Sequence, residues 1–98
     1  MFNKLKQFKD LRDKAKTLQS QLAQEKVEGS AAWGKLKVQM DGNLAVTNVT
    51  IDPELAADKT KLEAAVKEGV NDAVKRAQRK MAERMKQMGG LEGLGLGK

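Results

Sequence analysis

Residues 34–42 read G-K-L-K-V-Q-M-D-G and residues 44–51 read L-A-V-T-N-V-T-I, and these two runs decide the fold. In the first run apolar and polar residues alternate, which is typical of a strand with one buried and one solvated face. The dipeptide Asp41-Gly42 readily supplies the positive φ that a tight hairpin turn needs. The two runs therefore predict an antiparallel hairpin.

The return strand changes the parity of its apolar residues at Thr47-Asn48. Because a flat strand cannot turn both sets of apolar residues to one side, we expect a bulge there or a change in the face that is covered. Pro53, preceded by Asp52, ends the strand, since proline lacks an amide donor for the ladder. Residues 27–32 are expected to add a short edge strand.

A long helix is predicted before the hairpin, over residues 2–25, which contain neither Gly nor Pro. Its apolar positions recur at spacings of three and four residues, a narrow seam typical of a helix that packs on another helix. The seam consists of Phe8, Leu11, Ala15, Leu18 and Leu22. Gly29 is expected to end the helical segment.

A second long helix is predicted after the hairpin and a connection at residues 54–58. Thr60 and Glu63 fit a capping box, in which a hydroxyl and a carboxylate satisfy the first free amides of a helix. The apolar stripe then continues to about Met88. Gly69 lies inside this helix, where glycine costs roughly 1 kcal/mol relative to alanine, and it indicates close packing at that position.

Together these segments predict an α+β fold, an α-β-β-β-α protomer in which two long helices flank a small antiparallel sheet. The chain has 98 residues, enough for one core and too few for two. The single domain is assigned to residues 1–88. The tail at residues 89–98 is half glycine and is expected to be flexible.

The composition argues against catalysis. The chain contains no His, Cys or Tyr, which removes imidazole bases, thiol nucleophiles, disulfides and most zinc or Fe–S sites. We therefore predict that the protein is not an enzyme and holds neither a metal nor a cofactor. No apolar run is long enough to span a bilayer and no secretory signal is visible, so the expected location is the cytoplasm, without membrane contact.

Lysine and arginine number 19 against 13 acidic residues, and the excess is clustered at the two ends of the chain. Residues 73–88 hold six bases and one acid, whereas a solvated helix normally interleaves both signs. Clustered positive charge favours a polyanionic partner. The candidate phosphate contacts on the two helices are Lys6, Lys9, Arg12, Lys16, Lys75, Arg76, Arg79, Lys80, Arg84 and Lys86.

The predicted helices are longer than the sheet can cover. They span roughly 36–42 Å, whereas a strand of about seven residues spans only about 23 Å. The start of the first helix and the end of the second therefore extend past the sheet with their apolar stripes. Because such stripes are unfavourable in water, a second copy of the chain is the simplest partner, and we expect a homodimer.

Several segments have a characteristic order and spacing. They are V-E-G-S-A at residues 27–31, G-K-L-K-V-Q-M-D-G at 34–42, V-T-I-D-P-E-L at 49–55, V-N-D-A-V-K-R-A at 70–77, and a Met-rich end closing in G-G-L. In these segments the chain resembles the YbaB/EbfC family of bacterial nucleoid-associated DNA-binding proteins, over nearly its whole length. It departs from the family at Ala31-Ala32-Trp33, where a glycine-rich run is usual.

The resemblance implies a tweezers-like homodimer with protruding helices, associated with the nucleoid in the cytoplasm. It also implies that both helices bind DNA, altering DNA conformation or gene expression. Matching the V-N-D-A helix of the family places four cations where the basic residues of the family lie: Lys75, Arg76, Arg79 and Lys80. Base readout is expected to be weak, because lysine predominates in the first helix and no helix-turn-helix is evident.

Two other functions fit the residues. The main alternative is an assembly module, whose amphipathic helix ends clasp a protein of DNA replication or recombination. Binding to a membrane surface is a weaker alternative because, apart from Phe8, the apolar stripes lack bulky aromatic residues.

Trp33 suits either stacking on a base or packing at an interface.

Overall fold

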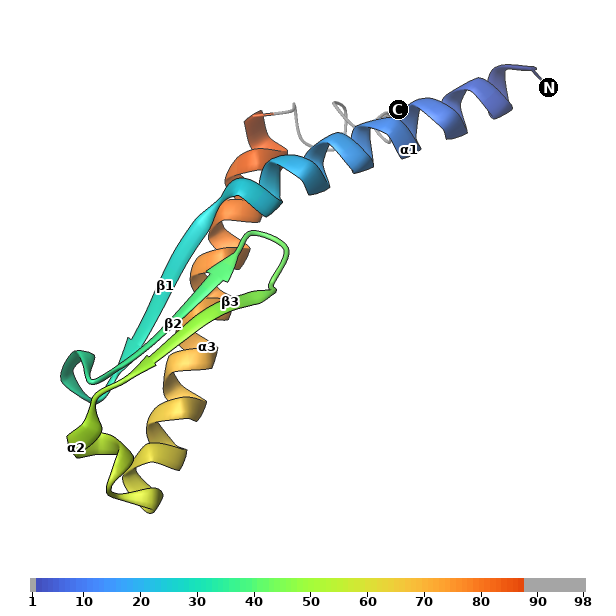
Figure 1. Ribbon diagram of the computed structural model, residues 1–98. Helices are drawn as coiled ribbons and strands as arrows, with labels where there is room; N and C mark the ends of the chain where they lie inside the picture. Colours follow the sequence, from blue (N-terminus) through green and yellow to red (C-terminus); the bar gives the residue numbers. More distant parts are fainter. Residues whose placement is uncertain (1, 88–98) are drawn as a thin grey trace.

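In the computed structural model of the chain, the described residues are 2–87, with the side chains of residues 5–87 (Figure 1). Met88 and the predicted tail at residues 89–98 lie outside them. The element order is α1 (Phe2–Gln24), β1 (Lys26–Ala31), the short 3-10 turn η1 (Ala32–Gly34), β2 (Leu36–Asp41), β3 (Val46–Ile51), α2 (Pro53–Ala56) and α3 (Lys59–Gln87). This order confirms the α-β-β-β-α prediction and adds the short helix α2 within the predicted connection.

The three strands form one antiparallel sheet in the order β1-β2-β3, so β2 is central and both neighbours are edge strands. Gln39 pairs with Asn48, but the next residue, Met40, pairs with Val46. Thr47 is therefore the extra residue of a β-bulge, which confirms the bulge that the parity change predicted. The bulge places the apolar residues on both sides of Thr47 on one face of the sheet.

The turn between β2 and β3 differs from the prediction. The side-chain Oδ1 of Asp41 accepts hydrogen bonds from the backbone N–H groups of Asn43 at 2.8 Å and Ala45 at 3.1 Å. Positive φ falls on Leu44, at 67°, and not on Asp41 or Gly42. The prediction of a tight Asp-Gly turn was wrong, because the Asp41 carboxylate organises a longer loop through the hydrogen bonds of an Asx turn.

That loop docks on the end of α1. The N–H of Gly42 donates to the carbonyl of Leu22 at 2.8 Å, and Asn43 Nδ2 donates to the carbonyl of Gln19 at 2.9 Å. A Cβ atom on Gly42 would lie 2.8 Å from both the carbonyl oxygen and Cδ2 of Leu22. Glycine is therefore required for this close approach, and the two hydrogen bonds fix the loop against the last turns of α1.

The ends of both long helices differ from the sequence expectations. Helix α1 ends at Gln24, so the prediction that Gly29 ends it was wrong; Gly29 lies inside β1. Helix α3 begins at Lys59, and Asp58 Oδ1 accepts from the N–H of Lys61 at 3.1 Å. Asp58 therefore caps α3 in place of the predicted capping box, since an ionised carboxylate is a stronger acceptor than a hydroxyl.

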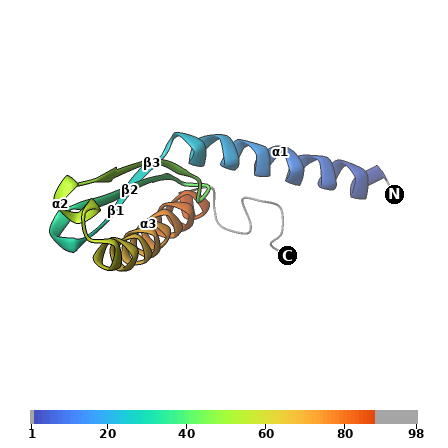
Figure 2. The ribbon, with the colours of Figure 1, turned by 60° about the horizontal axis from the view of Figure 1, so that its bottom comes forward.

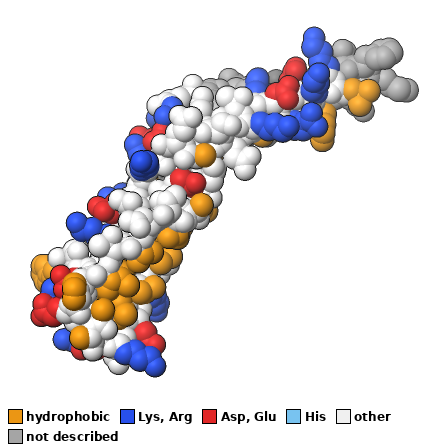
Figure 3. All heavy atoms as spheres, viewed as in Figure 1, with side chains coloured by type: hydrophobic (Ala, Val, Ile, Leu, Met, Phe, Trp, Pro, Cys, Tyr) orange, Lys and Arg blue, Asp and Glu red, His pale blue; other side chains and the backbone are white. Residues whose placement is uncertain are grey.

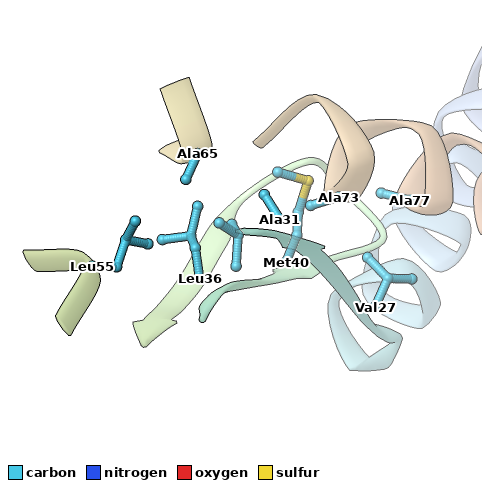
Figure 4. Packing of buried hydrophobic residues seen from close by; sticks show 9 residues of the cluster. Val27, Ala31, Leu36, Met40, Leu55, Ala65, Ala73 and Ala77 are labelled. Atoms are coloured by element: carbon cyan, nitrogen blue, oxygen red, sulfur yellow. The ribbon is translucent and has the colours of Figure 1, made fainter. Parts of the chain in front are cut away.

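The core lies between α3 and one face of β1 and β2 (Figure 4). Strand β2 supplies the largest fully buried side chains, which are Leu36, Val38 and Met40. Helix α3 faces them with small residues at every fourth position, which are Ala65, Gly69, Ala73 and Ala77. A stripe of small residues lets a helix approach a sheet closely, so large strand residues and small helix residues fill the same layer.

Two glycines allow this approach. A Cβ atom on Gly29 of β1 would lie 2.5 Å from the carbonyl oxygen of Gly69 and 2.8 Å from Cα of Ala73, so the two backbones touch here. A Cβ atom on Gly69 would lie 2.7 Å from Cδ2 of Leu36. The close packing predicted from Gly69 is therefore confirmed.

Helix α1 projects from this body (Figure 2), which gives the molecule principal extents of 62 × 19 × 17 Å. Leu22 is buried, but Phe8 is 70% exposed and Leu5 is 73% exposed. The uncovered start of the first helix agrees with the length argument. At the other end of the chain, Met81 and Met85 of α3 are half-buried.

Candidate nucleic-acid interface

A groove of about 470 Å³ runs between the outer edge of β1 and α3. Its lining residues are Lys26, Val27, Glu28, Arg76, Arg79, Lys80 and Glu83. Four of these residues are cations and two are carboxylates, so the groove has a positive balance. It brings together three of the cations that the sequence had singled out, which are Arg76, Arg79 and Lys80.

Asp72 fixes the position of α3 beside β1. Its Oδ2 accepts from the backbone N–H of Ser30 on the edge of β1 at 3.0 Å and from Arg76 Nε at 3.2 Å. The hydrogen bond from Ser30, assisted by the guanidinium of Arg76, lowers the pKa of Asp72 below its ordinary value. The same carboxylate therefore joins strand to helix and orients Arg76 along the groove.

Lys26 and Arg79 are the groove cations that take part in no ion pair within residues 5–87, whereas Lys80 approaches Glu83 at 3.8 Å. Lys26 precedes the first buried residue of β1, and sequence reasoning missed it. A single lysine at the start of a short strand produces no periodic signal. Lys26 and Arg79 line the same groove only because β1 packs against α3 in the folded chain.

The predicted cations of α1 lie on the projecting helix. Lys6, Lys9, Arg12 and Lys16 are all exposed, and their spacings of three, three and four residues keep them on one side of the helix. Within the described part of the chain none of them forms an ion pair with an acidic residue. They form a cationic ridge that is separate from the groove.

The remaining predicted cations of α3 have different surroundings. Lys75 and Lys86 are exposed. Arg84 is half-buried and pairs with Glu25, the residue between α1 and β1, through both Nε and Nη2. Arg84 therefore joins the end of α3 to the base of α1. The sequence had placed Arg84 among the cations that contact phosphate, and its ion pair with Glu25 was not predicted.

No helix among the described residues is long and apolar enough to cross a bilayer. No group of three or more acidic side chains within them is placed to hold a metal ion.

A cationic ridge and a cationic groove on a small α+β scaffold define a protein whose surface is suited to holding the phosphates of a nucleic acid. The chain belongs to the YbaB/EbfC DNA-binding family, whose sequence model matches residues 1–92. The family resemblance read from the sequence is thereby confirmed.

A curated relative agrees with this assignment. The chain is 41% identical over 98 residues to a nucleoid-associated protein of Afipia carboxidovorans, covering 95% of this chain and 93% of the relative. Among solved structures, an uncharacterized protein of Helicobacter pylori matches with a TM-score of 0.77 at 19% identity. That match covers 92% of this chain and 98% of the other, and it supports the fold.

Proposed function

We propose that this protein is a nucleoid-associated protein of the cytoplasm that binds duplex DNA by its phosphates, with little preference for sequence. The observation that carries the proposal is that one molecule presents both the β1–α3 groove, where cations outnumber carboxylates, and the exposed cationic ridge of α1. Membership of a DNA-binding family and the name of the Afipia relative support it. The protein acts by binding DNA and not by catalysing a reaction on it.

The proposal follows from the kind of contact that these cations make. Lysine and arginine on a helix face neutralise phosphates and release counterions, a contribution that does not depend on the base sequence. Base reading needs side chains placed at the groove edges of the bases, usually arginine, asparagine or glutamine in a bidentate geometry. Three of the four cations on the α1 ridge are lysines, which bind phosphate as point charges.

We also propose that the protein is a homodimer that associates through β3. Helix α3 covers β1 and β2 and leaves β3 open, so Val46, Val49 and Ile51 are each between 38% and 50% exposed. Val66 of α3 is also exposed. Figure 3 shows hydrophobic side chains gathered over β3 and the first half of α3. An apolar face beside an unpaired strand edge favours association with an identical face.

The two proposed surfaces are compatible in one molecule. The cationic groove lies at the β1 edge of the sheet, and the apolar face lies at the β3 edge. A dimer formed through β3 therefore leaves both grooves and both α1 ridges open. Two copies joined in this way hold their cationic surfaces at a fixed separation, which suits a ligand with a repeating charge such as DNA.

Replacing Arg76, Arg79 and Lys80 with Ala tests DNA binding. We expect weaker binding to every duplex in mobility shifts across a salt series, with the dimer unchanged by light scattering. Replacement of Lys59, Lys61 and Lys67, at the other end of α3, is the matched control and leaves binding unchanged. Loss of binding to a single sequence, or unchanged binding, contradicts the phosphate mechanism.

Val49→Asp tests the dimer. It places a charge at the centre of the proposed interface, on a side chain that is half-exposed in the protomer, so the fold is retained while the dimer dissociates. Thr50→Asp, the next residue on the same strand, faces the other side of the sheet and leaves the dimer intact. Equal molar masses for Val49→Asp and wild type in light scattering contradict association through β3.

A further inference from the structure

Trp33 stands on η1, the turn between β1 and β2, at the opposite end of the molecule from the free end of α1 (Figure 1). It is the only tryptophan in the chain, and its side chain is fully exposed. Its backbone is left-handed, with φ of 60°, and Ala32 beside it has φ of 53°. Such strain in residues other than glycine is typical of functional positions, and here it turns a large apolar ring into solvent.

Trp33 borders a pocket of about 560 Å³. Ala32, Leu55 and Ala65 supply apolar lining, from η1, α2 and α3. This volume lies within the range of about 300–1,000 Å³ that is usual for binding pockets. The apolar part of this pocket, beside an exposed indole, fits an apolar side chain of a partner, because the indole supplies a large contact area that is already in place.

The charges around the pocket restrict the partner further. Lys35 pairs with Glu54 at 3.1 Å, and Lys61 approaches Asp58 at 3.9 Å. Glu68, also on the lining, has no ion pair within residues 5–87. The partner should therefore carry a cation next to its apolar side chain.

The wider charge pattern argues against DNA as that partner. Residues 52–70, which include α2 and the start of α3, hold five acids and three bases, whereas residues 5–20 of α1 hold five bases and two acids. The lining of the Trp33 pocket likewise holds three carboxylates against the two cations Lys35 and Lys61, so the pocket has a small negative balance whereas the α1 end is positive. A polyanion is repelled from the pocket and attracted to the α1 end.

We propose that the Trp33 pocket of one copy binds the free end of α1 of another copy. Leu5 and Phe8 are exposed and three residues apart, so they lie on one side of α1. Lys9 and Arg12 each lie four residues beyond one of them, on the same side. That side of α1 therefore offers the pocket two apolar side chains flanked by two cations, the chemistry that its lining requires.

This contact joins opposite ends of two molecules. The free end of α1 and the η1 turn lie far apart in one copy (Figure 1), so α1 cannot reach the pocket of its own chain. A head-to-tail contact of this kind is heterologous and continues from copy to copy. It uses Lys9 and Arg12, which also belong to the proposed DNA ridge, so DNA and the neighbouring Trp33 pocket compete for α1. The competition, though not the contact, rests on the proposed function.

The fluorescence of Trp33 tests the contact directly, since no other tryptophan contributes. In the full-length protein without DNA, we expect the emission to move to shorter wavelength as the protein concentration rises, because the exposed indole becomes covered. Phe8→Ala should raise the concentration at the midpoint of this change at least tenfold, as loss of an aromatic anchor does. Leu44→Ala, which truncates an exposed leucine on the hairpin loop, is the matched control and leaves the midpoint unchanged.

Adding duplex DNA should return the emission to longer wavelength by releasing α1 from the pocket. Emission that is independent of concentration, or a midpoint that Phe8→Ala does not move, overturns the contact. A shift of the emission to shorter wavelength when DNA is added to dilute protein would place DNA on Trp33, and this result also overturns the contact. If the protein binds DNA in the same sample and the emission of the associated form stays unchanged, the competition is overturned. The Val49→Asp variant should show the same emission change, which separates this contact from the β3 interface.

Discussion

Arg84 Nε in α3 donates to Glu25 Oε1 at 2.6 Å, across 59 residues of sequence. Glu25 is the single residue between α1 and β1, and its side chain is only 17% exposed. Two hydrogen bonds from the hairpin loop and the packing of Leu22 also hold the base of α1. The ion pair therefore contributes to the direction in which α1 leaves the body.

Glu25→Gln should destabilise the fold by about 1–2 kcal/mol, because a charge-assisted hydrogen bond is replaced by a weaker neutral one. Urea unfolding measures this loss. Faster amide exchange at residues 19–24 should accompany it, since α1 is held less firmly. If neither stability nor exchange changes, Arg84 and Glu25 do not hold α1 in place.

The same substitution tests Arg84 as a phosphate contact. With Glu25 neutral, the guanidinium is released and DNA affinity at low salt should rise, with a salt slope steeper by up to about 0.9. Arg84→Ala should lower stability as Glu25→Gln does, without steepening the slope. Equal salt slopes for Glu25→Gln and wild type would show that Arg84 has a structural role alone.

The sequence predicted those parts of the fold that depend on local pattern. Alternation revealed β2, and the parity change at Thr47 revealed the bulge, because both are set by the two-residue period of a strand. The turn at Leu44 and the cap at Asp58 were missed, because several residues in each segment can accept the same amides. In the hairpin, the packing of the loop on α1 fixes the turn that forms.

The candidate site was predicted in part for a similar reason. Charge clustering identified Arg76, Arg79 and Lys80, since they stand on one helix and their spacing is visible. Lys26 enters the groove from a strand, and Arg84 is joined to Glu25 by tertiary contact. Neither relationship has a sequence period, so no local pattern could have revealed it.

Asp72 should make stability depend on pH in the acid range. Its pKa is lowered in the fold, chiefly by the hydrogen bond from the N–H of Ser30, so the folded state binds the proton less readily than the unfolded state. The stability that Asp72 contributes to the fold is fully present above its ordinary pKa of 3.8. It is lost as the pH falls through the lower pKa that Asp72 has in the folded state. Asp72→Asn should reduce stability at pH 7 and flatten its dependence on pH below 4. Urea unfolding across that range measures both, and a parallel pH dependence in the variant contradicts the assignment.

Gly29→Ala should be among the most damaging single substitutions. The new methyl group would meet the backbone of α3 at Gly69 and Ala73, and backbone cannot move aside as a side-chain end can. We expect a loss of about 3 kcal/mol or failure to fold, at the upper end of the usual cost of overpacking. Ser30→Ala, one residue along the same strand, keeps the N–H that bonds Asp72 and should change stability little. An unfolding midpoint for Gly29→Ala equal to that of wild type would falsify the close approach of β1 and α3.

Lys26 offers the sharpest test of the groove, because the basic faces of the helices do not include it. If DNA lies in the groove between β1 and α3, Lys26→Gln removes one phosphate contact and lowers affinity equally for unrelated duplexes. The slope of the logarithm of affinity against the logarithm of salt should become shallower by about 0.9. Lys67→Gln removes the same charge from the exposed surface of α3 near its start and should leave the slope unchanged. If both variants behave alike, the loss reflects net charge only; if Lys26→Gln matches wild type while DNA binding persists, DNA contacts the helices outside the groove.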